Sequence, residues 1–130
     1  MKKSYFILSA ALAGLFMLTV ALRPADMMDG FATGTPQLKS ISALSFGPNG
    51  ILFIGDSKGA SVYAIDTKDT QAVDASAAVE IKNVDQKIAA LLGTEVKNIT
   101  INDVAVNPIS KKIYVAVTTS DGSSTLLKVD

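Results

Sequence analysis

The sequence has no cysteine and no histidine among its 130 residues. Without cysteine there is no disulfide, no thiolate nucleophile, no thiolate metal site and no lipoprotein anchor on a thiol. Without histidine the chain lacks the most common general base near neutral pH and the most common transition-metal ligand. Any chemistry in these residues must therefore use carboxylates, amides, hydroxyls, lysine amines or phenols.

An excess of charge of one sign is also missing. Twelve Lys and Arg residues balance twelve Asp and Glu residues. Beyond the first few positions, the longest basic run is the pair Lys111-Lys112. A nucleic-acid-binding domain has a clustered basic surface, so we expect no nucleic-acid partner and no electrostatic attachment to a membrane.

Residues 1–22 have the pattern of a signal peptide or an N-terminal membrane anchor. Lys2 and Lys3 make a positive start, and residues 4–22 form an uncharged, mostly apolar run. We expect cleavage after Ala21, which makes the chain periplasmic or secreted. The apolar run is just long enough to cross a bilayer, so an uncleaved anchor in the membrane is the alternative. The chain is expected to be exported in either case.

A pattern of short apolar strands occurs twice in the remainder of the chain. After a linker at residues 23–39, residues 40–82 predict a first unit and residues 99–130 a second, incomplete one, each with turns that contain Gly, Asn, Asp or Pro. The matching positions are Ile41 and Ile101, Leu44 and Val104, Phe46 and Val106, Leu52-Phe53-Ile54 and Ile113-Tyr114-Val115, and Ile65-Asp66 and Val129-Asp130. A strand-only unit that recurs at a fixed spacing indicates a β-propeller.

The expected fold is all-β, with consecutive four-stranded antiparallel blades of a partial propeller. Neither side of the first strands is clearly polar, which is typical of strands buried between neighbouring blades. Residues 77–82 are the candidate for a fourth, outer strand. A sandwich of about seven strands is the competing fold. Because propellers close with several blades, we expect the N-terminal part of a larger propeller, a truncated product, or a module that assembles through its strand edges.

Residues 83–98 interrupt the strand pattern and predict a short helical insertion. Apolar residues at helical spacing form a stripe, and Asp85 is the expected N-terminal cap. Gly93 is placed to end the helix in the left-handed conformation. We expect this helix to cover exposed β surface rather than to bind a partner.

Most other polar residues fit structural roles. Asp56 is expected to form an Asx turn, and Tyr114 to be a packing residue whose hydroxyl reaches the sheet edge. Three further carboxylates lack the glycine and the alternating oxygen ligands of a calcium loop and are expected to be solvated turn residues. These are Asp66, Asp69 and Asp74.

Residues 44–54 (LSFGPNGILFI) and 102–108 (NDVAVNP) resemble blades of the NHL, YVTN and gluconolactonase (regucalcin-like) β-propellers. In gluconolactonase-like propellers, an Asn or Asp at the start of an inner strand can bind a divalent cation in the central channel. Asn102 and Asp103 match that position, so the resemblance implies a metal site there, for a cation such as Ca²⁺. The first unit has Ser42-Ala43 instead, and the alternative role for the Asn-Asp pair is hydrogen bonding to local backbone.

Blade motifs of this kind define a fold more than a function. The first hypothesis is an exported β-propeller segment that serves as a binding or interaction scaffold in the cell envelope. Its partners would be further blades or another protein at its strand edges, and a small molecule or saccharide at its loops or channel. The second hypothesis is part of a metal-dependent, lactonase-like propeller that hydrolyses sugar-acid lactones, with Asn102 or Asp103 as one ligand. A decayed copy without activity is the third.

Overall fold

The computed structural model describes residues 26–74 and 81–129. The chain divides into two units, Met1–Gly34 and Thr35–Asp130. The described part of the first unit, residues 26–34, contains one turn and no strand. No helix in the described part of the chain is long and apolar enough to cross a membrane.

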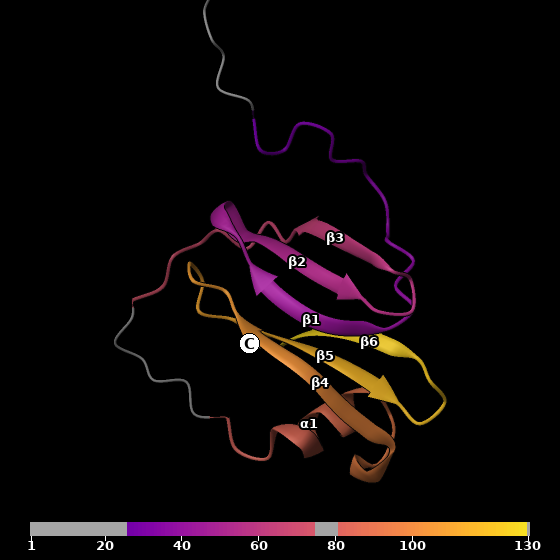
Figure 1. Ribbon diagram of the computed structural model, residues 1–130. Helices are drawn as coiled ribbons and strands as arrows, with labels where there is room; N and C mark the ends of the chain where they lie inside the picture. The colour runs from indigo at the N-terminus through magenta and orange to yellow at the C-terminus, as the bar shows by residue number, and fades with distance from the viewer. Residues whose placement is uncertain (1–25, 75–80, 130) are drawn as a thin grey trace, which may run out of the picture. The chain divides into compact units, whose positions relative to one another are not determined.

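The second unit contains two antiparallel three-stranded sheets and one α-helix (Figure 1). Their elements are β1 (Ile41–Phe46), β2 (Ile51–Asp56), β3 (Ser61–Asp66), α1 (Val84–Leu91), β4 (Ile99–Val106), β5 (Ile113–Thr119) and β6 (Ser124–Val129). Neighbouring strands in each sheet are consecutive in the chain. The turn between β1 and β2 needs positive φ, and Asn49 (φ 56°) and Gly50 (φ 74°) provide it. The expectation of a mostly β chain with a short inserted helix is confirmed.

The two sheets match residue for residue in their pairing. Leu44 lies opposite Ile54 in the first sheet, and Val104 lies opposite Val115 in the second. The first strand of each sheet has a bulge at the corresponding place, between Ile41 and Ala43 and between Ile101 and Asp103. A bulge leaves one residue outside the ladder and turns its side chain in a new direction. Ser42 and Asn102 are these two residues.

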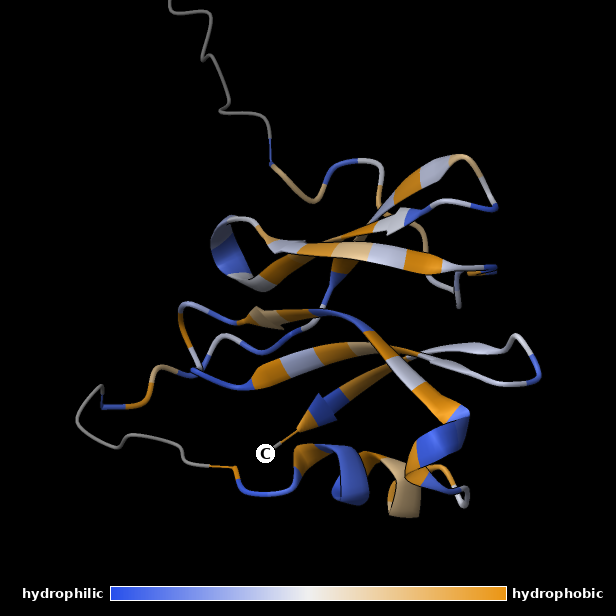
Figure 2. Ribbon diagram, turned by 60° about the horizontal axis from the view of Figure 1, so that its bottom comes forward, coloured by the Kyte–Doolittle hydropathy of each residue, from blue (hydrophilic) through white to orange (hydrophobic). Residues whose placement is uncertain are grey.

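The sheets stack face to face, and α1 lies against the far side of the second sheet (Figures 1 and 2). Successive strand residues point to opposite sides, so β5 contributes to both layers. Tyr114 and Ala116 belong to the core between the sheets, whereas Val115 and Val117 pack with Ile88 of the helix. The helix therefore covers a β surface, as the sequence predicted.

The ends of α1 are partly as expected. Asn83 (φ 54°), not Asp85, is the residue that precedes the helix, and its side chain makes no capping hydrogen bond. Asp85 lies in the first turn, where a negative charge is favourable to the helix dipole. Gly93 (φ 67°) ends the helix, and the next amide, of Thr94, donates to the carbonyl of Ala89 at 2.9 Å. This is the left-handed C-terminal motif predicted for Gly93.

A four-stranded sheet is not present in the described residues. Residues 77–80 of the candidate fourth strand lie outside them, and Ile81 and Lys82 are not in a strand. β3 and β6 are thus the last strands of their sheets in residues 26–74 and 81–129.

Asp56 fixes the chain where it enters β1. Its carboxylate is buried and accepts the backbone N–H groups of Lys39 at 2.7 Å, Ser40 at 2.9 Å and Gly59 at 2.8 Å. The bond from Lys39 lowers the pKa of Asp56, against the effect of burial, with help from the other two bonds. The expected turn at Asp56 is confirmed. Lys39, the last residue of the expected linker, is bonded to the first sheet.

Candidate functional site at the junction of the two sheets

The bulge in β4 directs the side chain of Asn102 toward the first sheet. Its amide nitrogen lies 2.9 Å from the carbonyl oxygen of Ile41 and 2.7 Å from the hydroxyl oxygen of Thr118. The corresponding residue of the first sheet, Ser42, instead donates to the carbonyl of Gly55 in its own sheet, at 3.1 Å. Only the second bulge therefore bridges the two sheets.

Asp103 makes the neighbouring bridge. One carboxylate oxygen accepts the backbone N–H of Leu44 at 2.7 Å, and the other accepts the N–H of Val104 at 2.8 Å. Among the described residues, β1 is an edge strand of its sheet, so its outward backbone groups have no strand partner in that part of the chain. Asn102 and Asp103 satisfy two of these groups. The structure therefore places the pair in a link between sheets, in addition to the local bond that the sequence suggested.

Asn102 and Asp103 are also the residues that the resemblance marks for a cation. Both oxygens of Asp103 already accept N–H groups. In the described ranges there is no group of three or more His, Cys, Asp or Glu residues that could hold a metal ion. The residues do not fit a cation in this arrangement, so we derive no catalytic step through one, and the cation site stays a prediction.

An open hollow of about 540 Å³ lies beside this bridge. Its polar groups are uncharged and come from both sheets and the segment before β1. The polar residues that line it are Ser40, Ser42, Thr100, Asn102 and Thr118. Ile41 and Ile101 add apolar surface. Such a lining can hydrogen-bond an uncharged polar molecule and has no charge with which to attract an ion.

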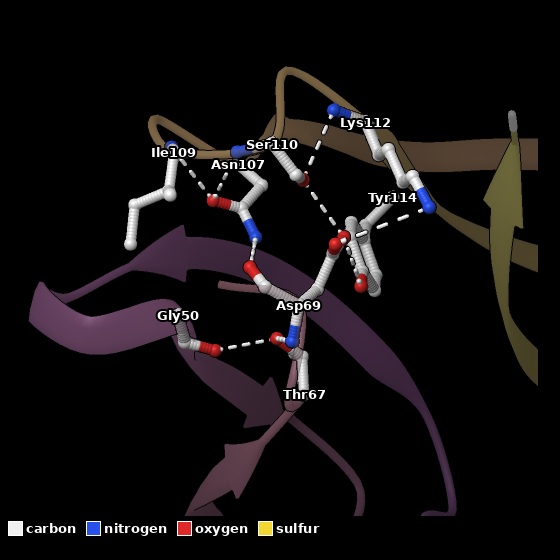
Figure 3. Close-up of polar contacts among 8 residues, drawn as sticks. All are labelled: Gly50, Thr67, Asp69, Asn107, Ile109, Ser110, Lys112 and Tyr114. Carbon is white, nitrogen blue, oxygen red and sulfur yellow. Dashed lines mark hydrogen bonds and ion pairs between the residues drawn. The ribbon is translucent and has the colours of Figure 1, made fainter. Parts of the chain in front are cut away.

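A second group of polar side chains, the Asp69 cluster, joins the loop after β3 to the turn between β4 and β5 (Figure 3). One carboxylate oxygen of Asp69 accepts the hydroxyls of Ser110 at 2.8 Å and Tyr114 at 3.1 Å. The ammonium of Lys112 lies 4.0 Å from its other oxygen. The amide of Asn107 donates to the backbone carbonyl of Asp69 at 2.8 Å. These five residues define the cluster.

The expectation that Asp69 is a solvated turn residue is wrong. Only 8% of its side chain is exposed, because the loop folds against the second sheet's turn. Burial raises the pKa of Asp69. The hydroxyl donors Ser110 and Tyr114 and the charges of Lys112 and Lys128 together outweigh it, so that the pKa lies below its usual value. The Tyr114 hydroxyl thus reaches a buried carboxylate. Ser110 is itself 3% exposed, which closes its hydroxyl to a substrate.

Asn107 is a residue whose role the sequence reasoning missed. It is fully buried, and its side-chain oxygen accepts the backbone N–H groups of Ile109 at 2.9 Å and Ser110 at 3.4 Å. The signal was the Asn-Pro dipeptide at Asn107-Pro108, which favours a turn stabilised by the Asn side chain. Its bond across to Asp69 was not visible from that dipeptide.

No protein-family model, no curated protein and no solved structure matches the chain. The function must therefore be inferred from the geometry of the two sheets, the hollow and the surfaces that remain exposed.

Proposed function

We propose that the chain is an exported binding or interaction scaffold of the β-propeller type in the cell envelope. Its two meanders are consecutive blades that further blades complete. The observation that carries this proposal is an exposed apolar face on the first sheet, at the end of the stack. The polar groups of the junction support it, because Asn102, Asp103 and Asp69 are all occupied in hydrogen bonds that hold the two sheets together.

The face of the first sheet that points away from the second is mainly apolar, and its charged residue Asp66 lies at the end of β3. We call the exposed part of this face the outer face, and it consists of Ala43, Ser45, Phe53, Val62 and Ala64. Phe53 is 42% and Val62 75% exposed. In stacked repeats a terminal unit normally has a polar outer surface, and a contiguous apolar patch marks an interaction site. The exposed apolar residues of the outer face therefore indicate that another blade or molecule covers this face in an assembly.

The hollow at the junction is the place where the scaffold would hold a small ligand. Its uncharged hydroxyls and amide suit a polyhydroxylated small molecule such as a saccharide. Asn102 would fix the orientation of that ligand through the oxygen of its amide, since its nitrogen is bonded to Ile41 and Thr118. Binding of such a ligand would be part of the proposed scaffold function.

The scaffold function is tested by placing a charge on the outer face. The full-length chain, expressed with its leader, is recovered from the envelope and sized by native electrophoresis and sedimentation. We expect the wild type to migrate in an assembly well above its own 13.6 kDa. Val62→Lys should release it as a monomer, because a lysine ammonium cannot be desolvated in an apolar contact without large cost.

Val73→Lys is the matched control, because Val73 is also exposed, at 50%, but lies in the loop after β3. It should leave the assembly unchanged. A wild-type chain that is monomeric in the envelope extract would contradict the proposal, and so would equal effects of the two lysine substitutions.

The lactonase-like alternative makes a different prediction, which concerns Ca²⁺. If Asn102 supplied a ligand, equilibrium dialysis of the purified chain should find one Ca²⁺ per molecule, lost in Asn102→Ala. From the occupied oxygens of Asp103 we expect no saturable Ca²⁺ binding by the wild type. Ser42→Ala, at the corresponding bulge of the first sheet, is the control. Stoichiometric binding that only Asn102→Ala removes would favour the enzyme over the scaffold.

A further inference from the structure

The core between the sheets shows how a face of one meander fits a face of another. Phe46 of β1 packs edge-to-face on Tyr114 of β5, with ring centroids 5.1 Å apart and an interplanar angle of 71°. Leu44 and Leu126 belong to the same core. The first sheet packs through the face that carries Leu44 and Phe46. The second sheet packs through the face that carries Tyr114 and Leu126, which in the repeat corresponds to the other face of the first sheet.

The residues that correspond to this contact are exposed on the two ends of the stack. Phe46 and Val106 hold the same place, because they pair with Leu52 and Ile113 in their sheets. Phe53 corresponds to Tyr114 in the same way, through its pairing with Ser45. Yet Val106 is 53% and Phe53 42% exposed. The part of the internal contact that β1 makes is therefore available a second time, in two separated halves. The counterparts of the β2 and β3 core residues are covered by α1.

The half on the second sheet is a strip along β4. It consists of Ile101, Val104 and Val106, which are 37%, 50% and 53% exposed. α1 packs on the side chains of β5 and β6 on this side of the sheet but leaves these three residues open. We call them the β4 strip. The three residues of the strip are uncharged, as are the five residues that make up the outer face.

We propose that a second copy of this chain covers the outer face, with Phe53 of one copy packed on Val106 of the β4 strip of the next. This inference rests on the proposed scaffold function and names its partner. The outer face and the β4 strip lie on opposite sides of the two-sheet stack, so one molecule cannot join its own. The contact uses two different surfaces and is therefore head-to-tail, and it repeats until a ring closes or a filament grows.

The contact between copies is weaker than the contact within the chain. In the second sheet Asn102 and Asp103 add hydrogen bonds to the backbone of β1. The corresponding residues of the first sheet, Ser42 and Ala43, cannot supply an amide and a carboxylate. Apolar packing alone holds the copies together, so the association is reversible and depends on concentration.

Introduced cysteines test the arrangement, since the native chain has none to compete. Full-length chains carrying Phe53→Cys and Val106→Cys, with different tags, are co-expressed and exported to the oxidising envelope. We expect a disulfide-linked dimer that contains both tags, seen on non-reducing gels and assigned by mass spectrometry. Lys58→Cys, in the exposed turn between β2 and β3, is the control and should link to neither variant.

A second pair, Val62→Cys with Val104→Cys, probes the same contact independently of the aromatic ring. Their counterparts within the chain are Leu126 and Leu44. Thermal unfolding near that of the wild type establishes that each variant folds, and at least one pair must form the mixed link.

Three results would overturn the inference. Links between two Phe53→Cys chains would show a face-to-face dimer, links to a different protein would show another partner, and folded variants without links would show no such contact. The scaffold function fails separately. If Val62→Lys releases the chain from an assembly but no mixed link forms, the proposed scaffold function is retained and the proposal that a second copy is the partner is rejected.

Discussion

Asp69→Ala lowers the free energy of unfolding by about 2–4 kcal/mol at neutral pH. The substitution removes the acceptor of the Ser110 and Tyr114 hydroxyls, which are 3% and 6% exposed as residues and cannot turn to water at the same site. A buried donor that loses its partner costs its desolvation free energy, and here two lose it together. The loop after β3 also loses its attachment to the second sheet.

The effect depends on pH with a definite sign. The pKa of Asp69 is lowered in the folded chain, because its hydroxyl donors and the nearby lysine charges together outweigh burial. A carboxyl whose folded pKa is lower than its unfolded pKa stabilises the fold above the unfolded value, and loses this contribution as pH falls through the folded value. The stability difference between wild type and Asp69→Ala should therefore be full at neutral pH and shrink in acid.

Urea denaturation at a series of pH values measures this prediction. Asp74→Ala is the control, because Asp74 is an exposed carboxylate in the same loop. It should change the unfolding free energy by less than about 0.5 kcal/mol. A difference between wild type and Asp69→Ala that stays constant or grows on acidification would contradict the proposed role of the charged form.

The strands and their turns could be predicted because their causes are local. Short apolar runs bounded by turn residues mark β1, β2, β4 and β5. Asn49-Gly50 marks a turn that needs positive φ. The match between the two units was also visible, since apolar residues recur at corresponding places in their strands although the turns differ in length. The fourth strand was expected at residues 77–82, of which residues 77–80 lie outside the described part of the chain and residues 81 and 82 are not in a strand.

The bonds of the junction could not be predicted, because they join residues that are close only once the sheets stack. Asp103 and Leu44 are 59 positions apart, and Asp69 and Tyr114 are 45 apart. The residue type did not indicate burial either, because Asp69 lies in a polar stretch typical of a solvated loop. The sequence placed Asn102 and Asp103 at the start of an inner strand, but the direction of Asn102 depends on a bulge.

The sequence predicted that the helix covers a β surface. Removing a side chain from this contact is expected to have the second large effect on stability. α1 places Ile88, 2% exposed, against Val115 and Val117 of β5. Ile88→Ala should lower the unfolding free energy by about 2–5 kcal/mol, because it deletes buried methylene groups and leaves a cavity between helix and sheet. Alanine is a good helix former, so the loss cannot come from helix propensity.

Leu91→Ala on the same helix separates packing from other effects. Leu91 is 67% exposed, and its replacement should change stability by no more than about 0.5 kcal/mol. The two variants are compared by urea denaturation and by hydrogen exchange of the β5 amides. Exchange should accelerate only in Ile88→Ala, because a loosened helix exposes the face of β5 that it covers. Equal losses from the two substitutions would mean that α1 does not cover the second sheet, and that the surface beside the β4 strip is open to a further blade.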